Sequence, residues 1–339
     1  MAKTYLSEFL PEEYHKRQHL LLYYNDLIVD MLKTADEYNL ISTKITFENE
    51  NDVPNGDEDQ IDWLIKHGYK KQAYDLTKRL IFFSLLRDFI LYMHESFSCS
   101  ERGKVTVAFA ISRKPLKDDL FYLCWILVDS NELVDYIMNK DTCLYDISKI
   151  SEDKKRDIIN RSCQLIDKNK YENILFDLIY KRNSNFGLSS VWDQSLHLVT
   201  GNKNYKTESG NLNFVFADND IWNEYWQLYY DKIPYIMNIA IDIITLIYED
   251  ILKPSQLFVN LNKAIRDLKF ILTYKEDEDD IDFSIYEKLF RTLEVNCDHC
   301  SKQYHLDGTV LKEFMYDYVY TCPHCNSEEL VGKYIYCQI

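Results

Sequence analysis

The stretch KKQAYDLTKRLIFFSLLRDFILYMHESF, residues 70–97, decides the fold class. Its apolar residues recur every three or four positions, which is the spacing of a helix with one buried face. They are Ala73, Leu76, Leu80, Phe83, Leu86, Ile90, Met93 and Phe97. The stretch therefore predicts a long helix that packs against other helices.

Similar patterns predict further helices on both sides of this one. Their expected ranges are 11–38, 58–67, 113–139, 153–168, 171–182, 191–200 and 221–251. The short apolar stretch 105–111 is compatible with a strand or with the start of a buried helix. With only 8 Gly and 6 Pro in 339 residues, the chain is poor in the turns that a β-rich fold needs. The sequence thus predicts a mainly α fold, with a multi-helix domain over 1–274.

Charge limits the classes of partner. A formal net charge of -16 repels nucleic acid unless basic residues are clustered. Such a cluster exists in 66–117, where eleven Lys and Arg stand against four Asp and Glu. This basic segment is the candidate RNA-binding surface. The alternative is that its charges lie on solvated helix faces and pair with acidic neighbours.

Neither end of the chain nor its interior suggests a membrane. The N-terminal residues are too polar for the apolar core of a signal peptide. No window approaches the roughly eighteen apolar residues of a spanning helix. We expect a soluble cytoplasmic protein without a membrane partner.

The C-terminal region changes character. The acidic run KEDEDDIDF opens an expected linker over 275–290, and residues 291–339 carry two Cys pairs. Cys297 and Cys300 form one Cys-x-x-Cys turn, and Cys322 and Cys325 form the second. Four thiolates presented by two tight turns suit a tetrahedral metal site, which predicts one structural Zn²⁺ without an open coordination position.

This region resembles a zinc ribbon, in which two such turns lie on neighbouring hairpins. Residues 314–321 are expected to form the strand that leads into the second turn. His299, His305 and His324 are rival ligands, but His299 and His324 each lie between the two Cys of a turn, and we expect these two outside the metal shell. The region is acidic, which favours a structural or protein-docking role over contact with nucleic acid.

A second candidate site lies in the 70–97 helix. Arg87 and His94 are seven residues apart, so they fall on one helix face, about 20° from alignment. That face also carries Leu80, Phe83, Ile90 and Leu91. An Arg half-buried among apolar side chains needs an acceptor partner. The two residues form either a catalytic pair or a cluster satisfied inside the core with a carboxylate.

Arg87-Asp88 followed by His94 resembles the Arg-x(4–6)-His motif of the HEPN superfamily. Members are all-helical, often dimeric, and many are metal-independent ribonucleases of prokaryotic toxin and defence systems. The resemblance implies that Arg87 stabilises the phosphorane, His94 acts as general acid or base, and Asp88 orients one of them. It also implies a homodimer in which the sites of two subunits face each other.

His197 is a further candidate for the catalytic set. It lies in VWDQSLHLVT, residues 191–200, between two loops and near Ser189, Ser190, Asp193 and Ser195, where it could line a cleft. The order of features in 183–250 resembles helical proteins of the abortive-infection type. The alternative for His197 is a helix cap. Two functions follow from the sequence: a HEPN-like ribonuclease with a structural zinc ribbon, or a non-catalytic helical scaffold whose ribbon docks a partner protein.

Overall fold

The computed structural model describes residues 6–47, 58–139, 141–181, 187–201, 206–214, 219–274 and 282–336. Within these ranges the protein is mainly helical and carries a small C-terminal ribbon, as predicted. The helices are α1 (His15–Glu37), α2 (Gln60–Lys66), α3 (Lys70–Glu101), α4 (Val105–Lys114), α5 (Leu120–Met138), α6 (Glu152–Leu165), α7 (Ile174–Tyr180), α8 (Leu188–Leu196), α9 (Asn219–Leu252), α10 (Gln256–Tyr274), α11 (Phe283–Phe290) and α12 (Gly308–Tyr316).

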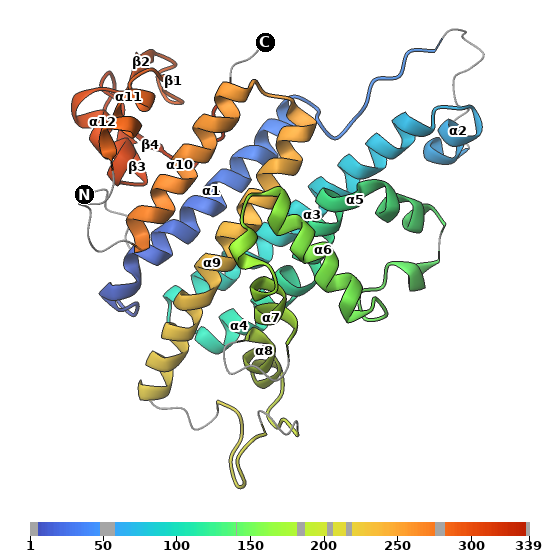
Figure 1. Ribbon diagram of the computed structural model, residues 1–339. Helices are drawn as coiled ribbons and strands as arrows, with labels where there is room; N and C mark the ends of the chain where they lie inside the picture. The colour runs from blue at the N-terminus through green and yellow to red at the C-terminus, as the bar shows by residue number, and fades with distance from the viewer. Residues whose placement is uncertain are drawn as a thin grey trace.

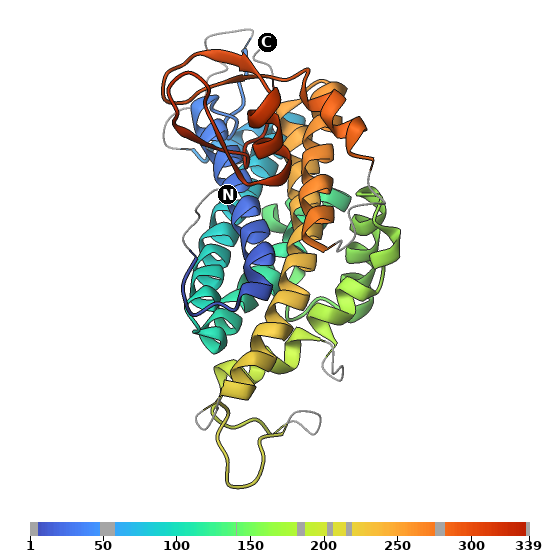
Figure 2. The same ribbon diagram turned by 90° about the vertical axis from the view of Figure 1, so that its left-hand side faces the viewer.

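The long helices form the body of the molecule. Helix α1 packs against α3, α9 and α10, and α3 packs in turn against α4 and α5. Figure 1 shows α1, α9 and α10 side by side, and Figure 2 shows the ribbon covering one end of this group. None of the described helices combines the length and the apolar character that crossing a lipid bilayer requires.

Most predicted helices are present, the open assignment of 105–111 is settled, and two helices, α10 and α11, were not expected. The stretch 105–111 is helical and belongs to α4, and a π-helical turn over Pro115–Asp119 separates α4 from α5. The expected linker contains helix α11, while its residues 275–281 lie outside the described part. None of the expected ranges covers helix α10. Half of its buried residues are polar or charged, so its sequence lacks a continuous apolar pattern.

The ribbon, residues 291–336, contains two antiparallel strand pairs. Strand β1 (Glu294–Asn296) pairs with β2 (Gln303–His305), and β3 (Val319–Thr321) pairs with β4 (Glu328–Leu330). Helix α12 lies between the two pairs along the chain. The expected strand over 314–321 is therefore wrong in its first half, because Leu311, Phe314 and Met315 form the buried face of α12.

The ribbon is joined to the helices by buried polar contacts. Lys269 of α10 is almost completely buried, and its ammonium group donates to the carbonyls of Phe314, Met315 and Asp317 at 2.6, 2.8 and 2.5 Å. These carbonyls end α12, where the chain itself offers no donor. One hydrophobic core runs from the helices into the ribbon.

The tail of the ribbon also lies tightly against the helices. Asn262 of α10 donates to the carbonyl of Ile335 at 2.7 Å and accepts from its amide at 2.8 Å. A Cβ atom on Gly332 would stand 2.6 Å from the Cβ of Asp26 in α1 and 3.0 Å from the Tyr23 carbonyl. Only glycine fits at this approach, so the docking of the tail is specific.

Leu86→Ala should lower the free energy of unfolding by about 2–5 kcal/mol, because Leu86 is fully buried on α3 and its loss leaves a cavity. Leu91→Ala on the same helix is the matched control. Leu91 is 62% exposed, and its change should stay within about 0.5 kcal/mol. Urea denaturation measures both. Equal effects at the two positions would contradict the assigned buried face.

Candidate functional site

Four cysteines converge in the ribbon. The Sγ atoms of Cys297, Cys300, Cys322 and Cys325 all lie within 4.8 Å of one another. Cys297 and Cys325 are 3.6 Å apart, and Cys300 and Cys322 are 3.9 Å apart. Sulfurs placed tetrahedrally about 2.3 Å from one metal ion stand about 3.8 Å from each other. The cluster is therefore compatible with a four-coordinate metal site.

Each Cys-x-x-Cys turn joins one strand pair and has the same backbone form. The amide of Cys297 donates to the Lys302 carbonyl at 3.0 Å, and the amide of Cys322 donates to the Ser327 carbonyl at 2.9 Å. Ser301 and Asn326 follow the second Cys of each turn with φ of 58° and 59°. In both turns this residue adopts the left-handed backbone conformation and reverses the chain. The two sulfurs of one turn therefore face the two sulfurs of the other turn.

Backbone amides point at two of the sulfurs. Burial nevertheless raises the pKa of the Cys297 thiol to about 12, and this thiol donates to Glu329 Oε1 at 3.0 Å. The amides of His299 and Cys300 donate to Cys297 Sγ at 3.3 Å, and the amide of His324 donates to Cys322 Sγ at 3.4 Å. The hydroxyl and amide of Ser327 lower the pKa of the Cys325 thiol to about 6. Donors of this kind stabilise a negative sulfur and thus favour metal ligation.

The histidines of the ribbon are exposed and lie outside the cluster. The described group that could hold a metal contains the four cysteines and no histidine. His305 pairs with Glu294 at 3.3 Å, and the ring of His324 lies edge-on to Tyr304. The donor set is thus four sulfurs, which suits a soft or borderline metal and leaves no position for substrate.

Arg87 and His94 lie together on the outer face of α3. Their side chains are 57% and 52% exposed, and Leu80 and Leu91 on the same face are exposed as well. The expected burial is confirmed for Phe83 and Ile90 but is wrong for Arg87, His94 and the two leucines. The buried face of α3 is centred about a quarter turn away, so Arg87 and His94 border it and do not enter the core.

The neighbours of this pair are acidic. A guanidinium nitrogen of Arg87 lies 3.6 Å from Asp36 of α1, and His94 Nδ1 lies 4.0 Å from Glu95. No described ion pair or hydrogen bond links Arg87 to His94. The pair is reachable by solvent, but carboxylates adjoin both side chains.

Asp88 faces a different partner from the one expected. It accepts from Lys114 of α4 instead of orienting Arg87 or His94. Beneath this pair, Asp119 of the π-helical turn is buried, and its Oδ2 has no protein partner. Burial, together with the charge of Asp88, raises the pKa of Asp119 to about 7. The cluster therefore holds one carboxyl group that keeps its proton well above the usual range.

Carboxylates also pair with several basic residues of the segment 66–117. Among the described contacts, five of its Lys and Arg residues form ion pairs, some of them with distant elements. The pairs are Lys66–Glu58, Lys78–Asp250, Arg79–Asp75, Arg87–Asp36 and Lys114–Asp88. These pairs lower the positive potential that the sequence suggests.

His197 follows α8, which packs against α4 and α7. Its side chain is exposed, and its carbonyl accepts from Asn213 at 2.7 Å. No described hydrogen bond or ion pair connects it with Arg87 or His94. His197 thus stands apart from that pair in its contacts.

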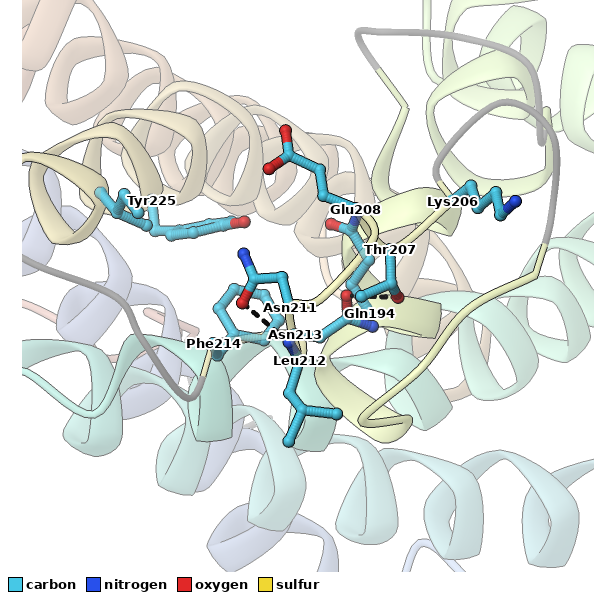
Figure 3. Close-up of a pocket in the computed structure, with 10 residues that line it drawn as sticks. Gln194, Lys206, Thr207, Glu208, Asn211, Leu212, Asn213, Phe214 and Tyr225 are labelled. Atoms are coloured by element: carbon cyan, nitrogen blue, oxygen red, sulfur yellow. Dashed lines mark hydrogen bonds between the residues drawn. The ribbon is translucent and has the colours of Figure 1, made fainter.

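A cavity of about 310 Å³ lies next to His197 but is lined by other residues. It is formed by the end of α8, the loop 206–214 and the start of α9 (Figure 3). The Thr207 hydroxyl donates to Asn213 Oδ1 at 2.9 Å and accepts from the backbone amide of Thr200 at 2.8 Å. These two hydrogen bonds hold the loop in place. Sequence reasoning missed this cavity, because its lining comes from a loop without a recognisable motif.

Comparison of the chain with models of protein families, with curated proteins and with solved structures finds no significant match. The site geometry alone therefore supports the functional argument, and no family match supports the resemblance to HEPN.

Asp119→Asn tests the buried carboxyl group. An unfolded Asp loses its proton near pH 4 and the folded Asp119 near pH 7, so the native protein loses stability as pH rises between these values. The neutral amide avoids this loss. The variant should therefore gain roughly 1–3 kcal/mol over the wild type at pH 8 and little at pH 4.

Urea denaturation at a series of pH values measures this effect. Asp157→Asn, at an exposed position of α6, is the control and should leave the pH dependence unchanged. A constant difference between Asp119→Asn and the wild type from pH 4 to pH 8 would contradict the assignment.

Proposed function

We propose that the chain is a helical scaffold whose C-terminal ribbon is held in shape by one structural Zn²⁺ and docks a partner protein. The observation that carries the proposal is the convergence of four cysteine sulfurs within 4.8 Å. Two amide-lined turns and four sulfurs are the usual surroundings of a structural zinc.

The surroundings of the cluster support a structural and docking role over a catalytic one. Four thiolates fill a tetrahedral shell, so the metal has no position left for substrate or water. A ribbon of this size buries little core of its own, and a metal then supplies much of its folding free energy. The ribbon already packs on α10 through Lys269, so a partner bound to the ribbon is fixed relative to the helices.

The purified chain should contain about one Zn per molecule, since four thiolates close one shell. Cys300→Ser should lose most of this zinc and unfold at a lower temperature, because the ribbon loses its centre. Cys143→Ser is the matched control, since Cys143 is exposed and lies outside the cluster. Elemental analysis and thermal denaturation measure both effects. Zinc content unchanged in Cys300→Ser, or no zinc in the wild type, would refute the proposal.

A second candidate function is a HEPN-like, metal-independent ribonuclease of a prokaryotic defence type. It is favoured by the exposure of Arg87 and His94 on one face of α3, where a substrate could reach both. In this proposal, His94 moves a proton at the 2′-hydroxyl or the leaving oxygen, and Arg87 stabilises the phosphorane. The carboxylates of Asp36 and Glu95 beside the pair weigh against it, because they repel phosphate.

If this second candidate is correct, the protein should cleave RNA and leave a 2′,3′-cyclic phosphate. Cleavage should fall by roughly 100-fold or more in His94→Ala, which is the usual scale for loss of a general acid or base. His67→Ala is the control, an exposed histidine at the end of α2. Gel and mass-spectrometric analysis of cellular tRNA and rRNA reads the outcome. Cleavage that survives His94→Ala in a folded variant would rule out this site.

A further inference from the structure

A groove opens between the ribbon and the helices. It has a volume of about 710 Å³ and is lined by four separate segments: the first two turns of α10, the stretch from the end of α11 through β1, the first Cys-x-x-Cys turn with β2, and the tail at Ile335 and Tyr336. Figure 1 shows α10, α11 and the ribbon next to one another. The size lies within the usual range for binding pockets in proteins.

The floor and one wall of the groove are apolar. Leu261 and Leu293 are buried at its floor, and Leu289 and Ile335 line it at partial exposure. Leu257 stands on the α10 wall with 64% of its surface exposed. Leu257 is contiguous with the apolar lining of the groove, and contiguous exposed apolar surface is typical of sites that bind a partner.

The rim on the ribbon side is acidic. Glu294 and Asp298 line the groove, and their side chains are 54% and 74% exposed. Among the described residues that line it there is no Lys or Arg, but both carboxylates have partners. Lys333 reaches Asp298 at 2.7 Å from outside, while Glu294 accepts from Gln303 at 2.8 Å and lies 3.3 Å from His305 Nε2. An acidic rim repels nucleic acid and attracts Lys and Arg of a protein partner.

We infer that this groove binds an amphipathic helix of a partner protein, with its apolar face against Leu257 and Leu293 and with Lys or Arg along the edge that meets Glu294. The inference rests on the proposed docking function and names its site and partner chemistry. A helix is favoured over an added strand because side chains line the groove, and helix-in-groove recognition uses apolar anchors at i, i+3, i+4 and i+7.

The groove also depends on the metal cluster. Glu294 and Asn296 belong to β1, which leads directly into Cys297. The ribbon wall therefore keeps its position only while the first Cys-x-x-Cys turn is formed. Binding at the groove should be lost when the metal is removed.

Fluorescence anisotropy with the full chain tests the inference. The probe is a labelled amphipathic peptide of about 16 residues with Leu at the four anchor positions and Lys along its edges. A second peptide carries Glu in place of Lys. We expect micromolar binding of the Lys peptide and at least about tenfold weaker binding of the Glu peptide.

Two variants locate the binding site. Leu257→Asp should weaken the Lys peptide by about tenfold or more, whereas Leu165→Asp, at an exposed position on α6, should have no effect. Glu294→Lys should weaken binding of the Lys peptide and strengthen binding of the Glu peptide. Unfolding of the ribbon alone would weaken binding of both peptides. Zinc content and thermal denaturation are measured for each variant.

The outcomes separate the inference from the proposed function. The groove assignment would be overturned by absence of binding, by equal binding of both peptides, or by binding that Leu257→Asp does not affect. In each of these cases, a zinc content of one per chain would leave the metal proposal intact. A chain without zinc would instead overturn the proposed function. A dimer that Leu257→Asp dissociates would assign the groove to a second copy of this chain and also overturn the inference.

Discussion

The contact between Lys269 and the end of α12 is the interaction on which the relation of ribbon and helices depends. Its ammonium group donates to three carbonyls inside a buried interface. Burial lowers the pKa of Lys269 to about 7, while the nearby charge of Asp317 favours the charged form. A cation at a helix C-terminus also opposes the negative end of the helix dipole. Removing it would leave several buried carbonyls without a donor, at about 1–3 kcal/mol for each such group.

The cysteine cluster and the Lys269 contact lie in different parts of the ribbon. The four cysteines fix the two strand pairs relative to each other, and α12 connects the pairs along the chain. Lys269 and Asn262 then attach α12 and the tail to α10. Buried charge continues into the helices, where Asp242 pairs with Lys168 at 2.6 Å and Arg266 at 3.1 Å. Ribbon, α10 and α9 are thus linked by successive polar contacts within one core.

The sequence predicted what is encoded locally and missed what depends on distant contacts. The helix over 70–97 follows from apolar spacing alone, and the cysteine cluster follows from two Cys-x-x-Cys turns, whose geometry is short-range. Helix α10 was missed because Asn262, Arg266 and Lys269 occupy its buried face and interrupt the apolar pattern. Only the surrounding carbonyls and carboxylates make these polar residues compatible with burial. Likewise, Arg87 and His94 share a helix face with leucines, but which face is buried depends on the neighbouring helices.

The central claim is that a bound metal holds the ribbon in the form that packs on α10. Amide hydrogen exchange before and after removal of the metal with a strong chelator tests it most directly. The account predicts that amides in β1–β4 and α12 lose protection, while the buried segments of α3 and α9 keep theirs, because their packing does not involve the cysteines. Unchanged exchange throughout 294–331 after complete removal of the metal would contradict the account.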